Sequence, residues 1–417
     1  MMTQFKENEV LNMDDLKINK RLIMTPGPVS VDPRVSQAMS NSILGQFDYE
    51  FVEIMNETME LIRQSFLTTN QWSFPIDGTS RSGLEAVISS IVKPGDEVLV
   101  PIIGRFGYLF TELVTRAGGI VHNIHKPMGE VFAQEEIIAA LDKYQPSVLA
   151  IVHGETSTGR LQPIDKIGQA CKERGIFSVV DAVATYQGAV IPVDKWQLDA
   201  VVGGAQKCLS IPSGITPITF NERFSEEINK RKRVELGIRS GETTEQDHFI
   251  RSNYLDLTQL QDYWSPKRLN HHTEATTAIY GLNVGLKLAL KEGVKARAQR
   301  HEYHHRGLKA ALEALGLEIF GDSDNEMKMV ICVNIPEGID DAAFRDGLLR
   351  NYGIEIAGSF GDLTGKIWRI GLMGYAVNKQ NILTFLSVFS LYLSQQGVTG
   401  IDPTKAMDTL INYYDNH

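Results

Sequence analysis

The stretch "LDAVVGGAQKCLSIPSG", residues 198–214, places a single lysine directly after a run of small and apolar residues. Such a run is typical of a buried strand, whereas a lysine usually keeps its ammonium group in water. A surface lysine that reaches into solvent is one explanation for Lys207. The other is a functional amine at the end of a strand.

Apolar runs alternate with amphipathic segments around this stretch, from about residue 72 to 220. Strands are expected in 72–77, 97–102, 147–154, 177–184, 199–206 and 216–220. Helices are expected in 82–92, 106–118, 134–144 and 164–175. This alternation predicts an α/β fold with a mainly parallel, doubly wound sheet.

The pattern changes near residue 274, where two long helices are expected before a mixture of short strands and helices. We therefore expect an N-terminal arm in 1–22, a large domain in 23–292 and a small α+β domain in 293–417. The apolar stretch 382–394 is too short to span a membrane and is expected to be a core helix.

The composition limits the class of protein. A net charge of -10 over 417 residues argues against a protein that binds nucleic acid by neutralising phosphates. The three cysteines, Cys171, Cys208 and Cys332, are odd in number and far apart, so they favour neither a disulfide framework nor a zinc site. The first 20 residues lack the apolar segment of a secretory signal, and a cytoplasmic location is expected.

Polar residues cluster where predicted strands end, which is where open parallel sheets bind ligands. The segment "DGTSRSG" (77–83) opens a helix, and its backbone N–H groups with the hydroxyls of Thr79 and Ser80 suit a phosphate; the same residues also suit a plain helix cap. Asp181 ends an apolar run, where it is either a cap, an ion-paired buried acid or a functional group.

A phosphate cup, a buried aspartate and a lysine after different strands together match what pyridoxal phosphate needs. The lysine forms a Schiff base with the cofactor, the acid keeps the ring nitrogen protonated, and the cup anchors the phosphate. On this interpretation the small residues before Lys207 leave room for a flat cofactor.

The order of motifs resembles the class V, fold type I aminotransferases of the alanine:glyoxylate and serine:pyruvate group. The likeness runs from "MTPGPVSVDPRV" (24–35) through "HGETSTG" (153–159), "VVDAVAT" (179–185) and "GGAQKCLSIPSG" (203–214) to "GKIWRIGLMG" (365–374). It implies a seven-stranded, mainly parallel sheet, pyridoxal 5'-phosphate as cofactor, and a homodimer with shared active sites.

The resemblance also implies residue roles, with Lys207 as the catalytic lysine, Asp181 as the partner of the ring nitrogen and Arg369 as the fork that binds the substrate α-carboxylate. It assigns Gly27 to the substrate site. Implied cofactor contacts are Thr79, Ser80 and Arg81 at the phosphate, Phe106 over the ring, Thr156, Val183 and Gln206 beside it, and His272 and Thr273 on the neighbouring subunit's phosphate. No metal is expected.

Two positions depart from the alanine:glyoxylate pattern, because Gln46 and Asn270 stand where many of those enzymes carry histidine and tyrosine. Both are carboxamides, which suit a substrate that ends in a urea or an amide. The pair resembles the bacterial ureidoglycine:glyoxylate aminotransferases of purine catabolism. It implies transfer of the amino group of (S)-ureidoglycine to glyoxylate, giving N-carbamoyl-2-oxoglycine and glycine. An alanine or serine:glyoxylate aminotransferase is the alternative.

Three histidines and a cysteine lie outside these motifs. His301, His304 and His305 have a spacing that can bind metal on a helix, but the flanking charges favour a solvated face. Cys208 is expected to be a small buried filler. A cysteine desulfurase lacks support because no thiol lies on a glycine-rich loop, and a nicotinamide oxidoreductase lacks its glycine fingerprint. A non-catalytic cofactor-binding scaffold remains open.

Overall fold

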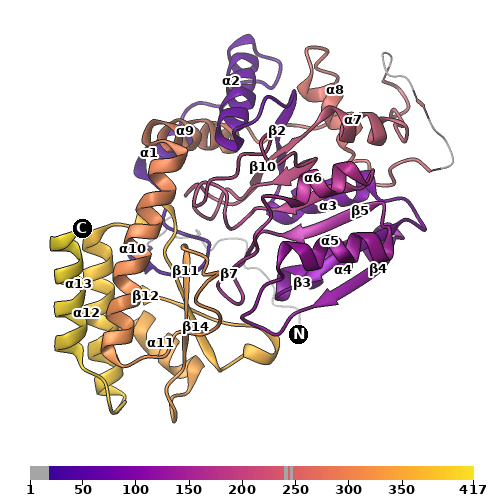
Figure 1. Ribbon diagram of the computed structural model, residues 1–417. Coiled ribbons are helices and arrows are strands. Elements are labelled where there is room, and N and C mark those ends of the chain that lie inside the picture. Colours follow the sequence, from indigo (N-terminus) through magenta and orange to yellow (C-terminus); the bar gives the residue numbers. More distant parts are fainter. Residues whose placement is uncertain (1–17, 239–242, 245–247) are drawn as a thin grey trace, which may run out of the picture.

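The computed structural model describes residues 18–238, 243–244 and 248–417 (Figure 1). Most of the expected N-terminal arm, residues 1–17, therefore lies outside the described residues. Within the described ranges, no helix combines the length and the apolar character needed to cross a membrane.

A seven-stranded sheet forms the centre of the larger part of the chain. Its strand order is β2-β10-β9-β8-β5-β3-β4, where β10 runs antiparallel to both neighbours and the other pairs are parallel. The strands are β2 (Trp72–Asp77), β3 (Glu97–Ile102), β4 (Ile120–His125), β5 (Val148–Val152), β8 (Phe177–Asp181), β9 (Ala200–Val202) and β10 (Ile215–Phe220). The predicted fold class, α/β with a mainly parallel sheet, is confirmed.

Six of these strands were expected from the apolar runs, and β4 was not. β4 pairs only with β3 at the edge of the sheet, and none of its six residues is fully buried, so it lacks the apolar run that marks the inner strands. The expected strands in 147–154, 177–184 and 199–206 extend too far. Their last residues leave the sheet and form the loops described below.

Helices cover the sheet, and Figure 1 shows α3 to α6 packed beside its strands. These helices are α3 (Ser80–Ile91), α4 (Arg105–Ala117), α5 (Gln134–Tyr144) and α6 (Ile167–Glu173), all in predicted segments. Gly83 lets α3 lie close to the sheet, because a Cβ atom there would lie 2.4 Å from Cγ2 of Thr216 on β10. This close contact fixes the position of the N-terminus of α3.

Five further helices belong to the larger part, and only the last of them was expected. They are α1 (Pro33–Met39), α2 (Tyr49–Phe66), α7 (Glu222–Asn229), α8 (Leu257–Trp264) and α9 (Thr276–Glu292). Helix α2 buries Phe51, Met55, Met59, Ile62 and Phe66, a stripe at the helical spacing, and packs along α9.

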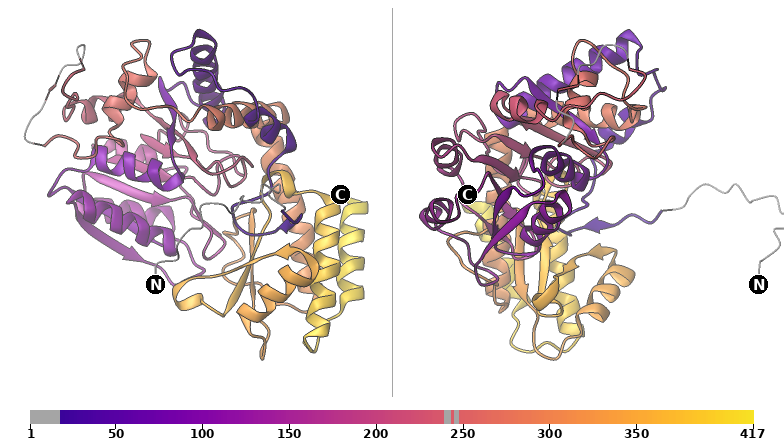
Figure 2. Two further views of the ribbon diagram at one scale, coloured as in Figure 1. Left: turned by 180° about the vertical axis from the view of Figure 1, so that it is seen from behind. Right: turned by 90° about the vertical axis from the view of Figure 1, so that its right-hand side faces the viewer.

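The rest of the chain has its own hydrophobic core, which contains residues from 308 to 414 together with Met24. A three-stranded sheet of β11 (Val330–Asn334), β14 (Ile367–Gly371) and β13 (Ala357–Gly358) lies beside four helices. Figure 2 shows the last two of them side by side, next to α10. The helices are α10 (Val294–Leu315), α11 (Asp341–Tyr352), α12 (Lys379–Gln395) and α13 (Pro403–Asn416).

The segment before α1 crosses to this second core. Strand β1 (Leu22–Ile23) pairs in parallel with β12 (Ile354–Glu355), and the backbone N–H of Gly371 donates to the carbonyl oxygen of Met24. The start of the described chain is thus bound to residues more than 300 positions later. The expected domain boundaries at 22/23 and 292/293 stay predictions.

The expectation that the three histidines of α10 form a solvated face is wrong. His301, His304 and His305 are all buried. Nδ1 of His301 donates to the carbonyl oxygen of Arg297, and its Nε2 accepts the backbone N–H of Gly374. The flanking charges do not indicate a solvated face, because α10 packs against several other elements. Arg297 and Arg300 of α10 form ion pairs with Glu292 of α9.

Candidate active site

A cavity of about 230 Å³ lies beyond the ends of strands β2, β5, β8 and β9. Residues from five stretches of the chain converge on it although they are far apart in the sequence. Its walls are Thr79, Ser80, Arg81, Leu84, Phe106, Leu109, Gly154, Thr156, Asp181, Val183, Ala184, Gln206 and Lys207. The structure therefore brings together the expected cofactor residues of the larger part, except His272 and Thr273.

Lys207 reaches this cavity from the turn after β9. Its Nζ donates a hydrogen bond to the carbonyl oxygen of Pro26, and a Cβ atom on Gly27 would lie 2.7 Å from Nζ. Burial, and then the positive charge of Arg369, lower the pKa of Lys207 to about 8. A surface lysine is therefore the wrong explanation for this residue.

Gly203 and Gly204, which precede the lysine, do not open space for a ligand. A Cβ atom on Gly204 would lie 2.3 Å from the carbonyl oxygen of Val183, and one on Gly203 would lie 2.9 Å from the ring of Tyr186. The small residues let the loop after β8 lie against the loop after β9. Their role is to bring Asp181 and Lys207 to the same cavity, which corrects the expectation that they make room for a flat cofactor.

Asp181 ends β8 and is 4% exposed. Its Oδ1 accepts the backbone N–H of Val183 at 2.9 Å, and no described residue donates to its Oδ2. Burial raises the pKa of Asp181 to about 7. A carboxyl group in this setting is stabilised as an anion by any cationic N–H donor that enters the cavity.

The N-terminus of α3 forms another wall. Thr79 is its N-cap residue, and its hydroxyl makes no capping hydrogen bond, so the first N–H groups of the helix are left for another acceptor. The hydroxyl of Ser80 donates to Oε1 of Gln206 at 3.1 Å, which ties this wall to the residue before Lys207. Free N–H groups and the positive end of the helix dipole favour an anion such as a phosphate.

Glu155 is a buried acid behind the cavity that the sequence interpretation missed. Its carboxylate accepts the backbone N–H of Phe106 at 2.9 Å, and the backbone N–H and the hydroxyl of Ser157 at 2.9 and 2.6 Å. A Cβ atom on Gly104 would lie 2.4 Å from Cδ of Glu155, so the site requires glycine there. Burial raises the pKa of Glu155. Its place after an apolar run is the same signal that singled out Asp181.

Arg369 comes from β14 and meets the cavity wall from the second core. Its Nε donates to the carbonyl oxygen of Gly358 at 2.6 Å and its Nη1 to that of Thr156 at 3.1 Å. Phe360 lies 4.6 Å from the guanidinium carbon and covers one face. Burial lowers the pKa of Arg369. Among the described residues its Nη2 has no hydrogen-bond partner, so one arm of the fork is left for a ligand.

Gln46, Asn270, His272 and Thr273 lie apart from the walls of this cavity. Nε2 of Gln46 donates to Oδ1 of Asn270 at 3.1 Å, and Oε1 of Gln46 accepts the backbone N–H of Glu274 at 3.0 Å. Asn270 and Thr273 are exposed. The structure thus joins the two carboxamides that the sequence singled out, but not to the cavity of their own chain.

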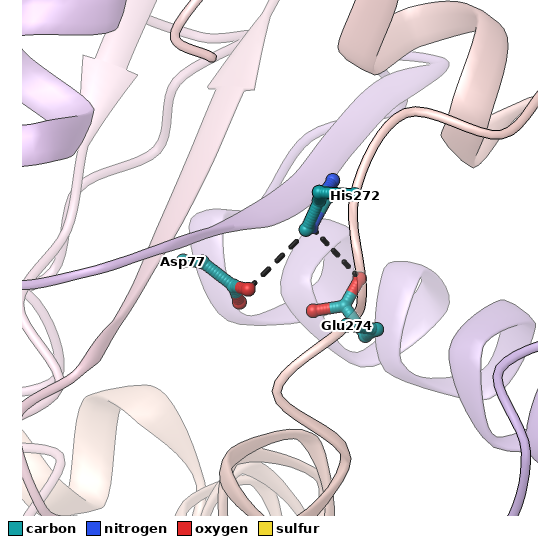
Figure 3. Close-up of side chains that lie close together, drawn as sticks. All are labelled: Asp77, His272 and Glu274. Carbon is teal, nitrogen blue, oxygen red and sulfur yellow. Dashed lines mark ion pairs between the residues drawn. The ribbon is translucent and has the colours of Figure 1, made fainter.

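His272 lies between two acids, as Figure 3 shows. Its Nε2 is 3.5 Å from Oδ2 of Asp77 and 3.7 Å from Oε2 of Glu274. Burial, and then the charge of Asp77, raise the pKa of Glu274 well above its usual range. These three side chains are the group of potential metal ligands found among the described residues. They join the 270–274 segment to the end of β2.

Comparisons with known proteins show the family of this chain. The model of the family described as aminotransferase class V matches residues 34–379. The chain is 51% identical to the (S)-ureidoglycine–glyoxylate transaminase of Bacillus subtilis, over 95% of this chain and 96% of that protein.

Two solved structures are also similar over nearly their whole length. The crystal structure of ureidoglycine-glyoxylate aminotransferase from Bacillus subtilis has a TM-score of 0.91 and 50% identity, and the match covers 96% of this chain and 100% of that one. Alanine–glyoxylate aminotransferase from Nostoc sp. has a TM-score of 0.87 and 34% identity, with 93% and 99% covered.

Proposed function

Because the chain belongs to the class V aminotransferases, we propose that it transfers the amino group of (S)-ureidoglycine to glyoxylate with pyridoxal 5'-phosphate as cofactor. The products are then N-carbamoyl-2-oxoglycine and glycine, and the reaction belongs to purine catabolism. The greater similarity to a ureidoglycine enzyme than to an alanine enzyme supports this donor over alanine.

One observation carries the cofactor proposal: a half-buried amine and a buried carboxyl group, which follow the adjacent strands β9 and β8, face one cavity whose third wall is a helix N-terminus. The residues that line the cavity fit pyridoxal 5'-phosphate. Lys207 provides the nucleophile for covalent attachment, Asp181 an acceptor for a protonated ring nitrogen, and Thr79, Ser80 and Arg81 the phosphate site. Phe106 supplies an aromatic face, and Thr156, Val183 and Gln206 supply side contacts.

Pyridoxal phosphate, when bound, supplies an electron-withdrawing ring that allows the Cα proton of an amino acid to leave. Lys207 takes that proton at Nζ and later returns it. Its lowered pKa, about 8, leaves a fraction of the amine neutral near pH 7 and so able to accept a proton. The ionised carboxylate of Asp181 holds the ring nitrogen in its charged form.

Arg369 binds and orients the α-carboxylate that the amino donor and glyoxylate share. Phe360 covers one face of the guanidinium, and Arg369 is only 6% exposed, so little water reaches it. The exclusion of water strengthens a charge-assisted pair between the guanidinium and the carboxylate. Gly27 lies against the substrate side of Lys207, where any side chain would displace the amine.

We propose that the enzyme is a homodimer in which Gln46, Asn270, His272 and Thr273 complete the site of the partner subunit. None of the four lines the cavity of its own chain, which supports this proposal. The exposed apolar side chains beside Gln46, namely Ile43, Phe47 and Tyr49 at 73%, 56% and 72% exposure, support it too. A cytoplasmic location belongs to the same proposal and is supported by three unpaired, buried cysteines.

Borohydride reduction followed by peptide mapping tests the chemistry. The expected result is cofactor attached to Lys207, and attachment at another lysine or at none would refute the assignment.

Steady-state rates with ureidoglycine, alanine and serine as donors and glyoxylate as acceptor test the substrate. Ureidoglycine should have the highest kcat/KM. A clear preference for alanine or serine would instead identify an alanine or serine:glyoxylate aminotransferase.

A further inference from the structure

The carboxamide pair Gln46 and Asn270 has a fixed hydrogen-bond direction. The oxygen and nitrogen of an amide side chain look alike in shape, so their assignment depends on their partners. Oε1 of Gln46 faces the backbone N–H of Glu274 at 3.0 Å, and a backbone N–H can only donate. Oε1 therefore lies on that side, and Nε2 must lie on the other.

The same reasoning carries over to Asn270. Nε2 of Gln46 is a donor, so the atom it meets at 3.1 Å must be the oxygen of Asn270. Nδ2 of Asn270 then points away from Gln46. One hydrogen on Nε2 and both on Nδ2 have no partner among the described residues, whereas both amide oxygens already accept a protein N–H.

Glu274 holds its N–H in place because its side chain is buried. It is 5% exposed and lies with His272 and Asp77 at the end of β2 (Figure 3), and Thr276 N–H donates to its carbonyl oxygen at 2.9 Å. The segment that sets the direction of the pair is therefore tied to the central sheet, not left free to turn.

From this arrangement we propose that the pair binds a hydrogen-bond acceptor on the substrate. It selects amino donors whose far end carries a carbonyl oxygen, and it rejects those whose far end can only donate a hydrogen bond. This rests on the proposed function, which assigns the two residues to the far end of the amino donor. For a ureido group, the atom bound would be the carbonyl oxygen and not the terminal NH₂.

Three amino donors separate the alternatives. Asparagine keeps the carbonyl oxygen and terminal NH₂ of ureidoglycine and replaces only the inner NH by CH₂. 2,4-Diaminobutyrate ends in an ammonium group, which can only donate. Alanine has no far end and serves to normalise each variant. The wild type should prefer asparagine to diaminobutyrate, mainly through KM.

Gln46→Glu should reverse this preference. The introduced carboxylate still accepts the N–H of Glu274 but has no hydrogen to give, so Asn270 turns its Nδ2 inward and its oxygen outward. The ratio of kcat/KM for asparagine to that for diaminobutyrate should fall at least about tenfold, the effect of about 1.4 kcal/mol. Asn270→Asp should change the ratio in the same direction, because it replaces the outward NH₂ by an oxygen.

Asn41→Asp is the matched control, since it adds the same charge at an exposed asparagine five residues before Gln46 that bonds only to the carbonyl oxygen of Ala38. It should leave the ratio unchanged. A ratio that stays constant in Gln46→Glu, or a loss equal for all donors including alanine, would overturn the inference. A wild type that uses alanine far better than ureidoglycine would refute the proposed donor alone, since the ratio test does not use ureidoglycine.

Discussion

Nη1 of Arg369 donates a 3.1 Å hydrogen bond to the carbonyl oxygen of Thr156, so a strand of the second core holds its guanidinium against the wall of the cavity. The residue before Thr156, Glu155, lies behind this wall and fixes the backbone of Phe106 and Ser157. The guanidinium of Arg369 and the backbone of Phe106 are thus both held by one short segment, 155–157.

Arg369→Lys should raise KM for glyoxylate and for the amino donor by about tenfold or more, because an ammonium cannot keep both backbone contacts and still offer a fork to a carboxylate. Steady-state kinetics with each substrate varied in turn would measure this. Arg350→Lys is a suitable control, since that arginine is exposed and pairs with Asp346 on the surface of α11. Equal KM values in wild type and Arg369→Lys would contradict the assignment.

Glu155→Gln should destabilise the fold by about 1–3 kcal/mol, because one buried N–H donor, of Phe106 or Ser157, would then face an NH₂ group. Denaturant unfolding gives the free energy. Glu135→Gln, at an exposed glutamate that pairs with Lys166, should change it by less than about 0.5 kcal/mol. If both variants unfolded at the same denaturant concentration, Glu155 would not have the positioning role described here.

Gly27→Ala should lower both stability and activity. The residue has φ +94, which costs an alanine about 1 kcal/mol or more, and the added Cβ would lie 2.5 Å from Cδ of Lys207. Gly95→Ala separates the two effects, because Gly95 has φ +89 and open space around it. Both variants should lose stability in thermal unfolding, and only Gly27→Ala should lose kcat. Equal kcat in the two would show that the contact with Lys207 is unimportant.

Asp181→Asn should change how the stability of the cofactor-free protein depends on pH. The carboxyl group ionises near 3.8 when unfolded and near 7 when folded, so the folded state binds the extra proton and stability falls as pH rises through this range. Asparagine cannot ionise, so the variant should gain up to about 4 kcal/mol over the wild type by pH 8. Urea unfolding at pH 4, 6 and 8 measures the difference, and parallel curves for the two proteins would exclude a perturbed Asp181.

The inner strands and the residues that follow them could be predicted from the sequence, because a buried parallel strand is a continuous apolar run and its last residue stands out when it is charged. This logic found Lys207 and Asp181. It failed at β4, whose edge position leaves no such run. It also failed at α10, where two of the buried histidines, His301 and His304, bond to residues far away in the sequence, Gly374 and Tyr414.

Contacts between distant segments also could not be predicted from the sequence pattern. The hydrogen bond between Gln46 and Asn270 joins residues 224 positions apart, and their local sequence does not indicate this contact. The role of Gly204 is similar: a glycine before a lysine suggests space, but the structure fills that space with the backbone of Val183.

The pairing of β1 with β12 has a consequence for how the protein is made. The N-terminus emerges from the ribosome first, but Leu22 and Ile23 can pair with β12 only after residues 354 and 355 have emerged. The segment from Met24 to Gly27, which packs against Lys207, therefore waits until translation is almost complete. A nascent chain stalled before residue 354 would carry the lysine loop without the backbone that covers it.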